Sequence, residues 1–423
     1  MFPNRRAAIA GKSPAIVAWT NRVGSFELAE FGINLAKTMS DAAFIDDFLA
    51  RSLRSAQSQQ DAVWTLTAET NWEQVWARVE YHGIAFLLNR HSRRICDWPY
   101  KLQERIAEEA RLIALWETTH LNALVRVIDA LADAGIETVL MKGTALAYSF
   151  HDEPATRRRG DTDLLIRPKD RVRTRMILLE LGWHRKEDPH GLYYQEGWLY
   201  HSAGFFVHSI DLHWEPSDRP TLQGSLPINA FFNNRIKVPR LHPRAYRPCS
   251  ALMIVHATIN QKWHALFGYH SESGRLASPK RLIWSIDLSL ICQSMTVDDW
   301  HELETHCNAH GIGALVAKAL RGMQSDIHNA IPEESLANLE AQPLDADVAS
   351  YFASSDSLTQ FRIDLKRTSS LRKKARLIRM RAFPPRQHLL EKYPTAKNWP
   401  TAVLQGRLLI ETAGRAVRKV GSR

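Results

Sequence analysis

Three aspartates lie where a carboxylate is costly to bury without a cation. Asp161 and Asp163 are two residues apart in a segment, residues 161–166, whose Leu-Leu-Ile ending predicts a strand. Their side chains then point to the same face of a sheet, where two negative charges repel each other unless a cation lies between them. Asp211 stands among apolar residues in a second expected strand, residues 210–214. Oxygen ligands of this kind suit Mg²⁺ or Mn²⁺.

A phosphate-binding segment is expected upstream of these aspartates. Lys142, Gly143 and Thr144 lie where an expected strand, residues 138–141, passes into a helix. Free N–H groups and the helix dipole favour a phosphate there, and a glycine allows close approach of the backbone. Arg159 is a further candidate phosphate ligand. Asp-x-Asp pairs and Lys-Gly-Thr segments are common in ordinary turns, but in this order they predict phosphoryl transfer assisted by two metal ions.

The spacing of apolar residues predicts the elements that must position these side chains. Helical spacing dominates from about residue 41 to 131, and Ala134-Gly135 is expected to end that run. Short apolar segments then alternate with a helical one, which predicts a small α/β sheet domain. Its expected elements are strands 138–141 and 161–166, a helix from Pro168 to Gly182, and extended segments 192–200 and 205–214.

Helices return after residue 216. Residues 251–267, 280–292 and 402–417 are expected to be helical, whereas four prolines predict an irregular surface segment over 384–400. We divide the chain into a poorly ordered basic extension, an N-terminal helical region, the α/β core, a helical domain and a basic C-terminal helical tail. These parts are residues 1–38, 39–118, 119–215, 216–340 and 341–423. For the extension, an organellar transit peptide or a start at Met39 are alternatives.

Three segments occur in an order that is specific in combination: residues 139–146 (VLMKGTAL), 159–166 (RGDTDLLI) and 211–214 (DLHW). This set resembles the uncharacterised bacterial nucleotidyltransferase family, which belongs to the DNA polymerase β-like superfamily. The resemblance covers roughly residues 70 to 400, including residues 81–85, 251–256 and 281–287. Where the wider superfamily has Gly-Ser after the first strand, this sequence has Gly143-Thr144, which keeps the hydroxyl group.

The resemblance implies an α/β (α+β) nucleotidyltransferase core with a mixed sheet, in which Asp161, Asp163 and Asp211 form the metal triad. The expected reaction transfers a nucleoside monophosphate from an NTP, with ATP as the expected nucleotide and Mg²⁺ or Mn²⁺ as cofactor. The expected acceptor is a hydroxyl group of a small molecule or peptide, and pyrophosphate is released. Transfer onto a protein or an RNA, and a non-catalytic NTP-binding scaffold, are the alternatives; the intact triad disfavours the scaffold.

Three further residues are candidates for accessory roles. By strand alternation His213 shares the face of Asp211, and it is either a structural histidine or a group that orients Asp211 or touches substrate. Lys262 lies on an expected helix and either reaches a phosphate or, as we favour, faces solvent. Asp287 either packs between helices or contacts the nucleotide. The histidines and cysteine in residues 301–310 match no zinc pattern.

The net charge of +10 originates in the C-terminal tail. Residues 361–423 hold 17 Lys or Arg against three acids, a net charge of +14, so the preceding residues carry −4. This distribution disfavours a nucleic-acid partner unless the tail supplies the groove. In the tail, Leu371, Ala375 and Ile378 form an apolar stripe among basic residues. We favour a helix packed on the body, with an acidic partner or an anionic membrane surface as the alternative.

Four dispersed cysteines form no CxxC pair, which argues against a disulfide framework and a cysteine-rich zinc module. A reducing, cytoplasmic location is therefore expected. No uncharged apolar run approaches the roughly 18 residues of a membrane helix, so no transmembrane segment is expected.

Overall fold

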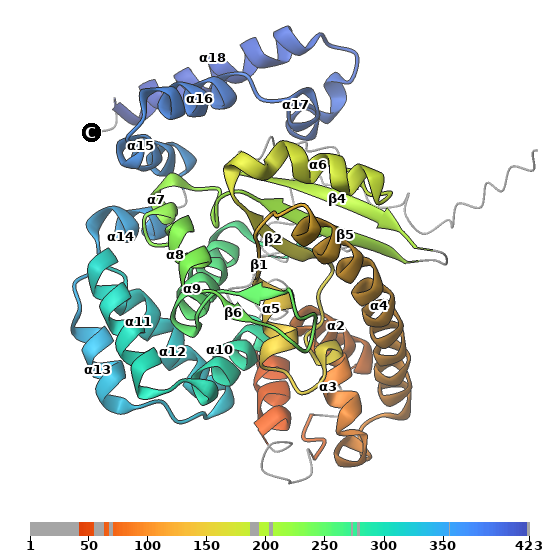
Figure 1. The fold of residues 1–423 in the computed structure, drawn as a ribbon. Helices are drawn as coiled ribbons and strands as arrows, with labels where there is room; N and C mark the ends of the chain where they lie inside the picture. The colour runs from red at the N-terminus through yellow and green to blue at the C-terminus, as the bar shows by residue number, and fades with distance from the viewer. Residues whose placement is uncertain are drawn as a thin grey trace, which may run out of the picture.

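The computed structural model describes most of the chain (Figure 1). The described residues are 42–54, 63–66, 71–186, 194–202, 206–271, 274–276, 280–354 and 356–420. The expected basic extension, residues 1–38, lies outside them. Within the described ranges no helix is both long enough and apolar enough to cross a membrane.

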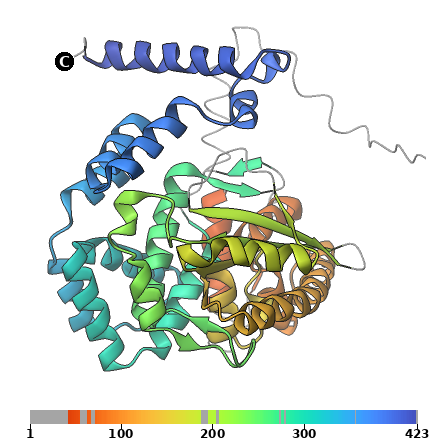
Figure 2. The same cartoon turned by 45° about the horizontal axis from the view of Figure 1, so that its top comes forward.

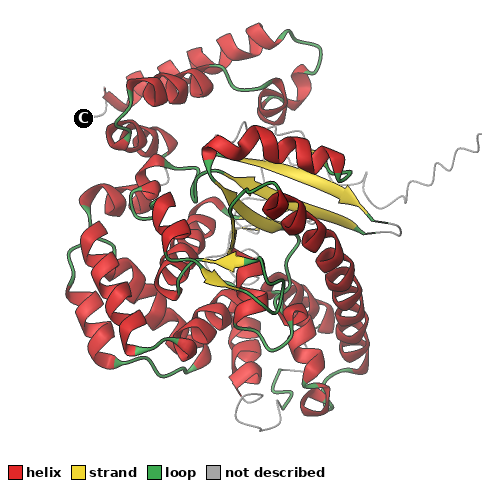
Figure 3. Cartoon of the chain, viewed as in Figure 1, coloured by secondary structure: helices red, strands yellow, loops and turns green. Residues whose placement is uncertain are grey.

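A five-stranded mixed sheet forms the centre of the fold (Figure 3). Its strands are β1 (Thr138–Met141), β2 (Thr162–Ile166), β3 (His184–Arg185), β4 (Gln195–His201) and β5 (Val207–His213). They lie in the order β1-β2-β5-β4-β3. The pair β2–β5 is parallel and the other neighbours are antiparallel. The α/β core with a mixed sheet and helical flanks is confirmed.

Two helices cover one face of this sheet, α4 (Tyr100–Asp133) and α6 (Arg171–Glu180) (Figure 1). Helix α4 ends where the sequence predicts, because Gly135 takes the left-handed conformation with φ of 69°. Arg175 on α6 pairs with Glu196 on β4, and the ring of Trp116 on α4 lies 5.8 Å from that of His208 on β5. The opposite face of the sheet carries the aspartates.

The N-terminal helices form a second core with the first half of α4. They are a helix over residues 42–54, α2 (Trp72–His82) and α3 (Ala85–Arg90). Phe48, Val79 and Leu88 are buried in this core together with Ile283 from the later helix α10 (Leu282–Ser294). Arg281 ties the same parts together, since its Nε donates to the carbonyl of Tyr81 at 2.6 Å.

Helices that follow the sheet pack on it through one continuous hydrophobic core. They gather beside the sheet in Figure 1 and are α7 (Pro220–Gln223), α8 (Ile228–Asn233), α9 (Ser250–Phe267), α10 (Leu282–Ser294), α11 (Val297–His310), α12 (Gly313–Ile327), α13 (Glu333–Ala341) and α14 (Ala346–Ala353). Two short hairpins, β6 (Ile236–Lys237) with β7 (Tyr246–Arg247) and β8 (Tyr269–Ser271) with β9 (Gly274–Leu276), interrupt them.

The C-terminal helices extend from the body in an arc (Figure 2). They are α15 (Ser357–Arg367), α16 (Leu371–Ala382), α17 (Arg386–Lys392) and α18 (Thr401–Val420). The prediction that residues 384–400 are irregular is wrong, because they contain α17. Pro385 occupies the N-cap of α17 and Pro394 follows its end, so these prolines bound the helix instead of breaking it.

The apolar stripe of α16 does not make the packing contact that the sequence suggested. Leu371 and Ile378 are 81% and 51% exposed. The buried residue of this helix is Leu377, which packs inward in their place. The favoured interpretation, a helix packed through that stripe, is therefore wrong about the contact face. Contact of the basic tail with an acidic partner or membrane surface stays a prediction.

The sheet core generates a stability prediction. Leu164 on β2 is fully buried, so Leu164→Ala should lower the free energy of unfolding by about 2–5 kcal/mol. Leu179→Ala on α6 is the matched control, because that side chain is 57% exposed and the change should stay within about 0.5 kcal/mol. Urea denaturation of both variants checks this, and an equal effect would contradict the described packing of β2.

Candidate active site

Two aspartates face each other across the parallel pair of strands. Asp163 on β2 lies directly opposite Asp211 on β5 in the register. His213, two residues further along β5, points to the same face. Ligand atoms of Asp163, Asp211 and His213 all lie within 4.8 Å of one another. This set contains two members of the predicted triad and an accessory candidate, while Asp161 falls outside it.

Asp161 nevertheless belongs to the same electrostatic cluster. It immediately precedes β2, and burial together with the negative charges of Asp163 and Asp211 raises its pKa to about 7. Burial and the charge of Asp163 also raise the pKa of Asp211. Both shifts share two causes, the burial of the carboxyl groups and the negative charge of the neighbouring aspartates.

Lys142 and His213 provide the positive charge and hydrogen bonds that Asp163 receives. Lys142 Nζ lies 2.5 Å and His213 Nε2 lies 2.9 Å from Oδ1 of Asp163. Burial acts to raise the pKa of Asp163, but these two contacts hold it below its usual range. Burial acts to lower the pKa of Lys142, but the carboxylate of Asp163 raises it to about 12. His213 therefore contacts Asp163, and its Nδ1 has no partner among the described residues.

The backbone of Lys142 is strained at the point where β1 passes into helix α5 (Lys142–Ser149). Its φ is 45°, a left-handed conformation that among the described non-glycine residues only His328 shares. Such a conformation costs about 1–3 kcal/mol and persists where the surroundings enforce it. It places the ammonium group over Asp163, and no side chain caps the N-terminus of α5.

The donor set fits a divalent cation. Carboxylate oxygens are the ligands that Mg²⁺ and Mn²⁺ prefer, and an imidazole is accepted by Mn²⁺ more readily than by Mg²⁺. Asp163 and Asp211 would hold the ion, with Asp161 and His213 beside them. A cation there would offset the negative charge that, together with burial, raises the pKa values of Asp161 and Asp211.

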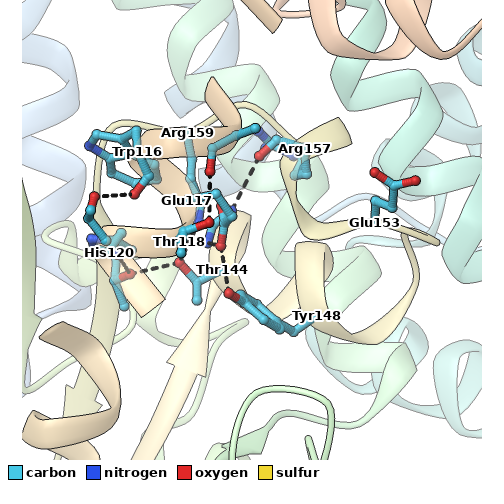
Figure 4. Close-up of polar contacts among 12 residues, drawn as sticks. Trp116, Glu117, Thr118, His120, Thr144, Tyr148, Glu153, Arg157 and Arg159 are labelled. Atoms are coloured by element: carbon cyan, nitrogen blue, oxygen red, sulfur yellow. Dashed lines mark hydrogen bonds and ion pairs between the residues drawn. The ribbon is translucent and has the colours of Figure 1, made fainter. Parts of the chain in front are cut away.

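A buried ion pair lies behind the site (Figure 4). Arg159 Nη2 donates to Oε1 of Glu117 on α4 at 2.7 Å, and the two side chains are 3% and 11% exposed. Arg159 Nε donates to Thr144 Oγ1 at 3.1 Å. The hydroxyl of Tyr148 donates to the same Glu117 oxygen at 2.6 Å. The pair thus joins α4 to α5 and to the loop before β2.

The same contacts continue into β2 between the two aspartates. Thr144 Oγ1 lies 2.8 Å from Thr162 Oγ1, which lies 2.7 Å from His120 Nε2. The ring of His120 stacks on Trp116, with 4.4 Å between their centroids (Figure 4). Thr162 is the residue between Asp161 and Asp163, so this chain of contacts fixes the strand that carries them.

These partners bear on two residues that the sequence predicts to bind phosphate. Thr144 is fully buried and its hydroxyl contacts Arg159 and Thr162. The guanidinium of Arg159 is likewise engaged inside the protein. An added Cβ at Gly143 would lie 3.4 Å from Cβ of Arg159, which is close to an ordinary contact, so this packing does not itself require a glycine. The geometry therefore favours a positioning role for Arg159 and for the Thr144 hydroxyl.

The remaining accessory candidates have separate settings. Asp287 is buried: both of its oxygens accept from Arg157 Nε, at 2.9 and 2.8 Å, and Oδ1 lies 3.0 Å from His151 Nε2. These contacts join α10 to the segment between α5 and β2, and Asp287 also lines a cleft beside Lys142. A contact of Asp287 with the nucleotide stays a prediction. Lys262 is partly buried on α9 and does not line that cleft.

Two acids of the site lack a signal in the motifs. Asp218 follows β5 after a Pro-Ser turn, and burial raises its pKa while His213 and Lys142 act to lower it, which places it beside the cluster. The amide of Tyr194 donates to its Oδ1 at 3.3 Å. Glu117 lies in a long amphipathic helix, where its burial could have been noticed from its place among apolar residues.

Comparison with known proteins bears on the whole of this region. No curated protein sequence matches the chain. The model of a family described as an uncharacterised nucleotidyltransferase matches residues 68–327, which is more than half of the chain. The matched residues include the sheet, the aspartates and helices α9 and α10. The chain therefore belongs to this uncharacterised nucleotidyltransferase family.

Proposed function

We propose that the protein transfers a nucleoside monophosphate from an NTP, ATP in the first instance, to a hydroxyl group of a small molecule or peptide in a reaction that depends on Mg²⁺ or Mn²⁺. The observation that carries this proposal is the register that sets Asp163 opposite Asp211 beside Lys142. Membership of the family supports nucleotidyl transfer. The buried negative charges of the cluster, which raise the pKa values of Asp161 and Asp211, support a cation at this position.

Each group has a defined task in this reaction. Asp163 and Asp211, assisted by Asp161 and His213, hold the metal, which neutralises phosphate charge and activates the attacking hydroxyl when bound. Lys142 and the N-terminal amides of α5 bind the β- and γ-phosphates. Because Lys142 already contacts Asp163, its ammonium group is within reach of a phosphate held at the same place.

The transfer replaces one bond of the α-phosphorus with another. The acceptor oxygen forms a bond to the α-phosphorus, and the bond from that phosphorus to the oxygen bridging to the β-phosphate breaks. Pyrophosphate leaves with the bonding electron pair. The hydroxyl proton passes to a carboxylate of the cluster, for which Asp211 is best placed as the least buried of the opposed pair.

Arg159 and Glu117 act as positioning residues in this scheme. Their ion pair holds Thr144 at the start of α5 and, through Thr162, the strand with the aspartates. A rigid support of this kind matters because small displacements of catalytic groups reduce rate strongly.

Metal-dependent binding of NTP is the first test. The thermal stability of the full chain should rise with one or more NTPs only when Mg²⁺ or Mn²⁺ is present, by about 2.7 kcal/mol at 100 times the dissociation constant. Asp163→Asn should remove this gain because it deletes a ligand charge. Asp298→Asn, an exposed acid on α11, is the control and should retain it.

The outcome that contradicts the proposal is equally specific. If none of the four NTPs stabilises the unaltered protein at millimolar concentration with either metal, the site is not a nucleotide site. The protein is then a scaffold that has kept its carboxylates for another reason.

The positioning role generates a second test. Glu117→Gln leaves the buried charge of Arg159 unpaired, so the free energy of unfolding should fall by about 3–5 kcal/mol. NTP affinity, measured well below the melting temperature, should fall as well because the start of α5 loses its support. Glu340→Gln, which alters an exposed pair with Arg321, should change neither quantity appreciably. A loss of stability with unchanged NTP affinity would reduce Glu117 to a purely structural residue.

A further inference from the structure

An open cleft lies beside Lys142, between α5, α9 and α10. Most of its wall is apolar and includes Leu146, Met253, Leu288 and the indole of Trp284. Asn260 and Gln261 are the polar side chains near the end of its α9 wall.

The charged groups that line the cleft are already neutralised. Arg157 and Asp287 form an ion pair with each other, and the ammonium group of Lys142 rests on Asp163. Burial lowers the pKa of His256 to about 3, so its imidazole is neutral at physiological pH. A strongly charged ligand therefore finds no counter-charge inside the cleft, whereas a neutral one is accommodated without desolvating an ion.

Two amide side chains offer hydrogen bonds to a ligand. Asn260 and Gln261 are partly buried on α9, and their side chains make no hydrogen bond within the described part of the chain. Each amide presents both donors and an acceptor. Met253, Ala257 and Asn260 recur at helical spacing, so one face of α9 places apolar surface and an amide on the same wall. The complement of this wall is a flat, neutral heterocycle with donors and acceptors on its edge.

The cleft adjoins the aspartate site through Lys142, which lines the cleft and also contacts Asp163. An NTP has this distribution of chemistry: a polyanion at one end and a neutral heterocycle at the other. We propose that the cleft receives the nucleobase of the NTP and that Asn260 and Gln261 discriminate between bases. This inference rests on the proposed function, since it names the part of the same substrate that lies away from the metal.

The experiment separates the base from the phosphates. Binding of ATP, GTP, CTP, UTP and inorganic tripolyphosphate to the full chain is measured by calorimetry, each with Mn²⁺. The unaltered protein should prefer one NTP. The double variant Asn260→Ala, Gln261→Ala should weaken the binding of that NTP by about tenfold or more, since each lost hydrogen bond contributes about 0.5–1.5 kcal/mol. It should also reduce the differences in affinity among the four NTPs. Its affinity for tripolyphosphate should not change.

Two further proteins complete the design. The double variant Gln74→Ala, Asn308→Ala removes the same two amide types from exposed positions and should bind like the unaltered protein. Ala257→Phe places a large side chain in the cleft from a partly buried position on α9. It should also weaken the binding of the NTP and leave the affinity for tripolyphosphate unchanged.

The possible failures are distinguishable. Unchanged NTP affinity and base preference in both cleft variants would overturn the assignment of the cleft and leave the proposed function standing. Parallel loss of NTP and tripolyphosphate would also overturn it, because the amides would then support the phosphate site. If the unaltered protein binds neither ligand, the proposed function fails and the inference fails with it.

Discussion

The parallel pairing of β2 with β5 brings negatively charged side chains together at the centre of the sheet. Lys142 and His213 contact one of these carboxylates. The register sets Asp163 opposite Asp211, and Asp161 lies one residue before the strand. Burial and like charges this close raise the pKa of Asp161 and Asp211, while Lys142 and His213 hold the pKa of Asp163 below its usual range. A divalent cation would offset the same negative charge more fully than the single positive charge of an ammonium group.

Helix α4 links this site to the rest of the molecule. Its first half is buried with the N-terminal helices, and its second half packs on the sheet. Glu117 and His120 lie in its second half, and each contacts a residue that holds the site: Glu117 binds Arg159 and His120 contacts Thr162. The N-terminal helical region is therefore connected to the aspartates through a rigid element. On the other side of the sheet, α9 and α10 line the cleft. The sheet therefore lies between helix α4 and this cleft.

Local patterns in the sequence predicted the elements well, because strands and helices leave different apolar spacings. Strand β1 and the helices α9, α10 and α18 lie close to their expected positions. Strand order is non-local, so the pairing that joins Asp163 to His213 could not be derived from spacing. The composition of residues 384–400 gave the wrong answer, since prolines can flank a helix as well as interrupt it. The partners of Arg159 and Thr144, and the walls of the cleft, depend on packing between distant segments, which no local pattern records.

Anomalous diffraction from crystals grown with Mn²⁺ and an NTP tests the central claim most directly, because the anomalous signal of manganese distinguishes the ion from the lighter atoms of protein and nucleotide. The account predicts anomalous density bounded by the carboxylates of Asp163 and Asp211, with Lys142 Nζ moved from Asp163 to the phosphates. Such density should be lost in crystals of Asp163→Asn. Manganese bound elsewhere, or an NTP bound while Lys142 still contacts Asp163 and no ion lies between the aspartates, would contradict it.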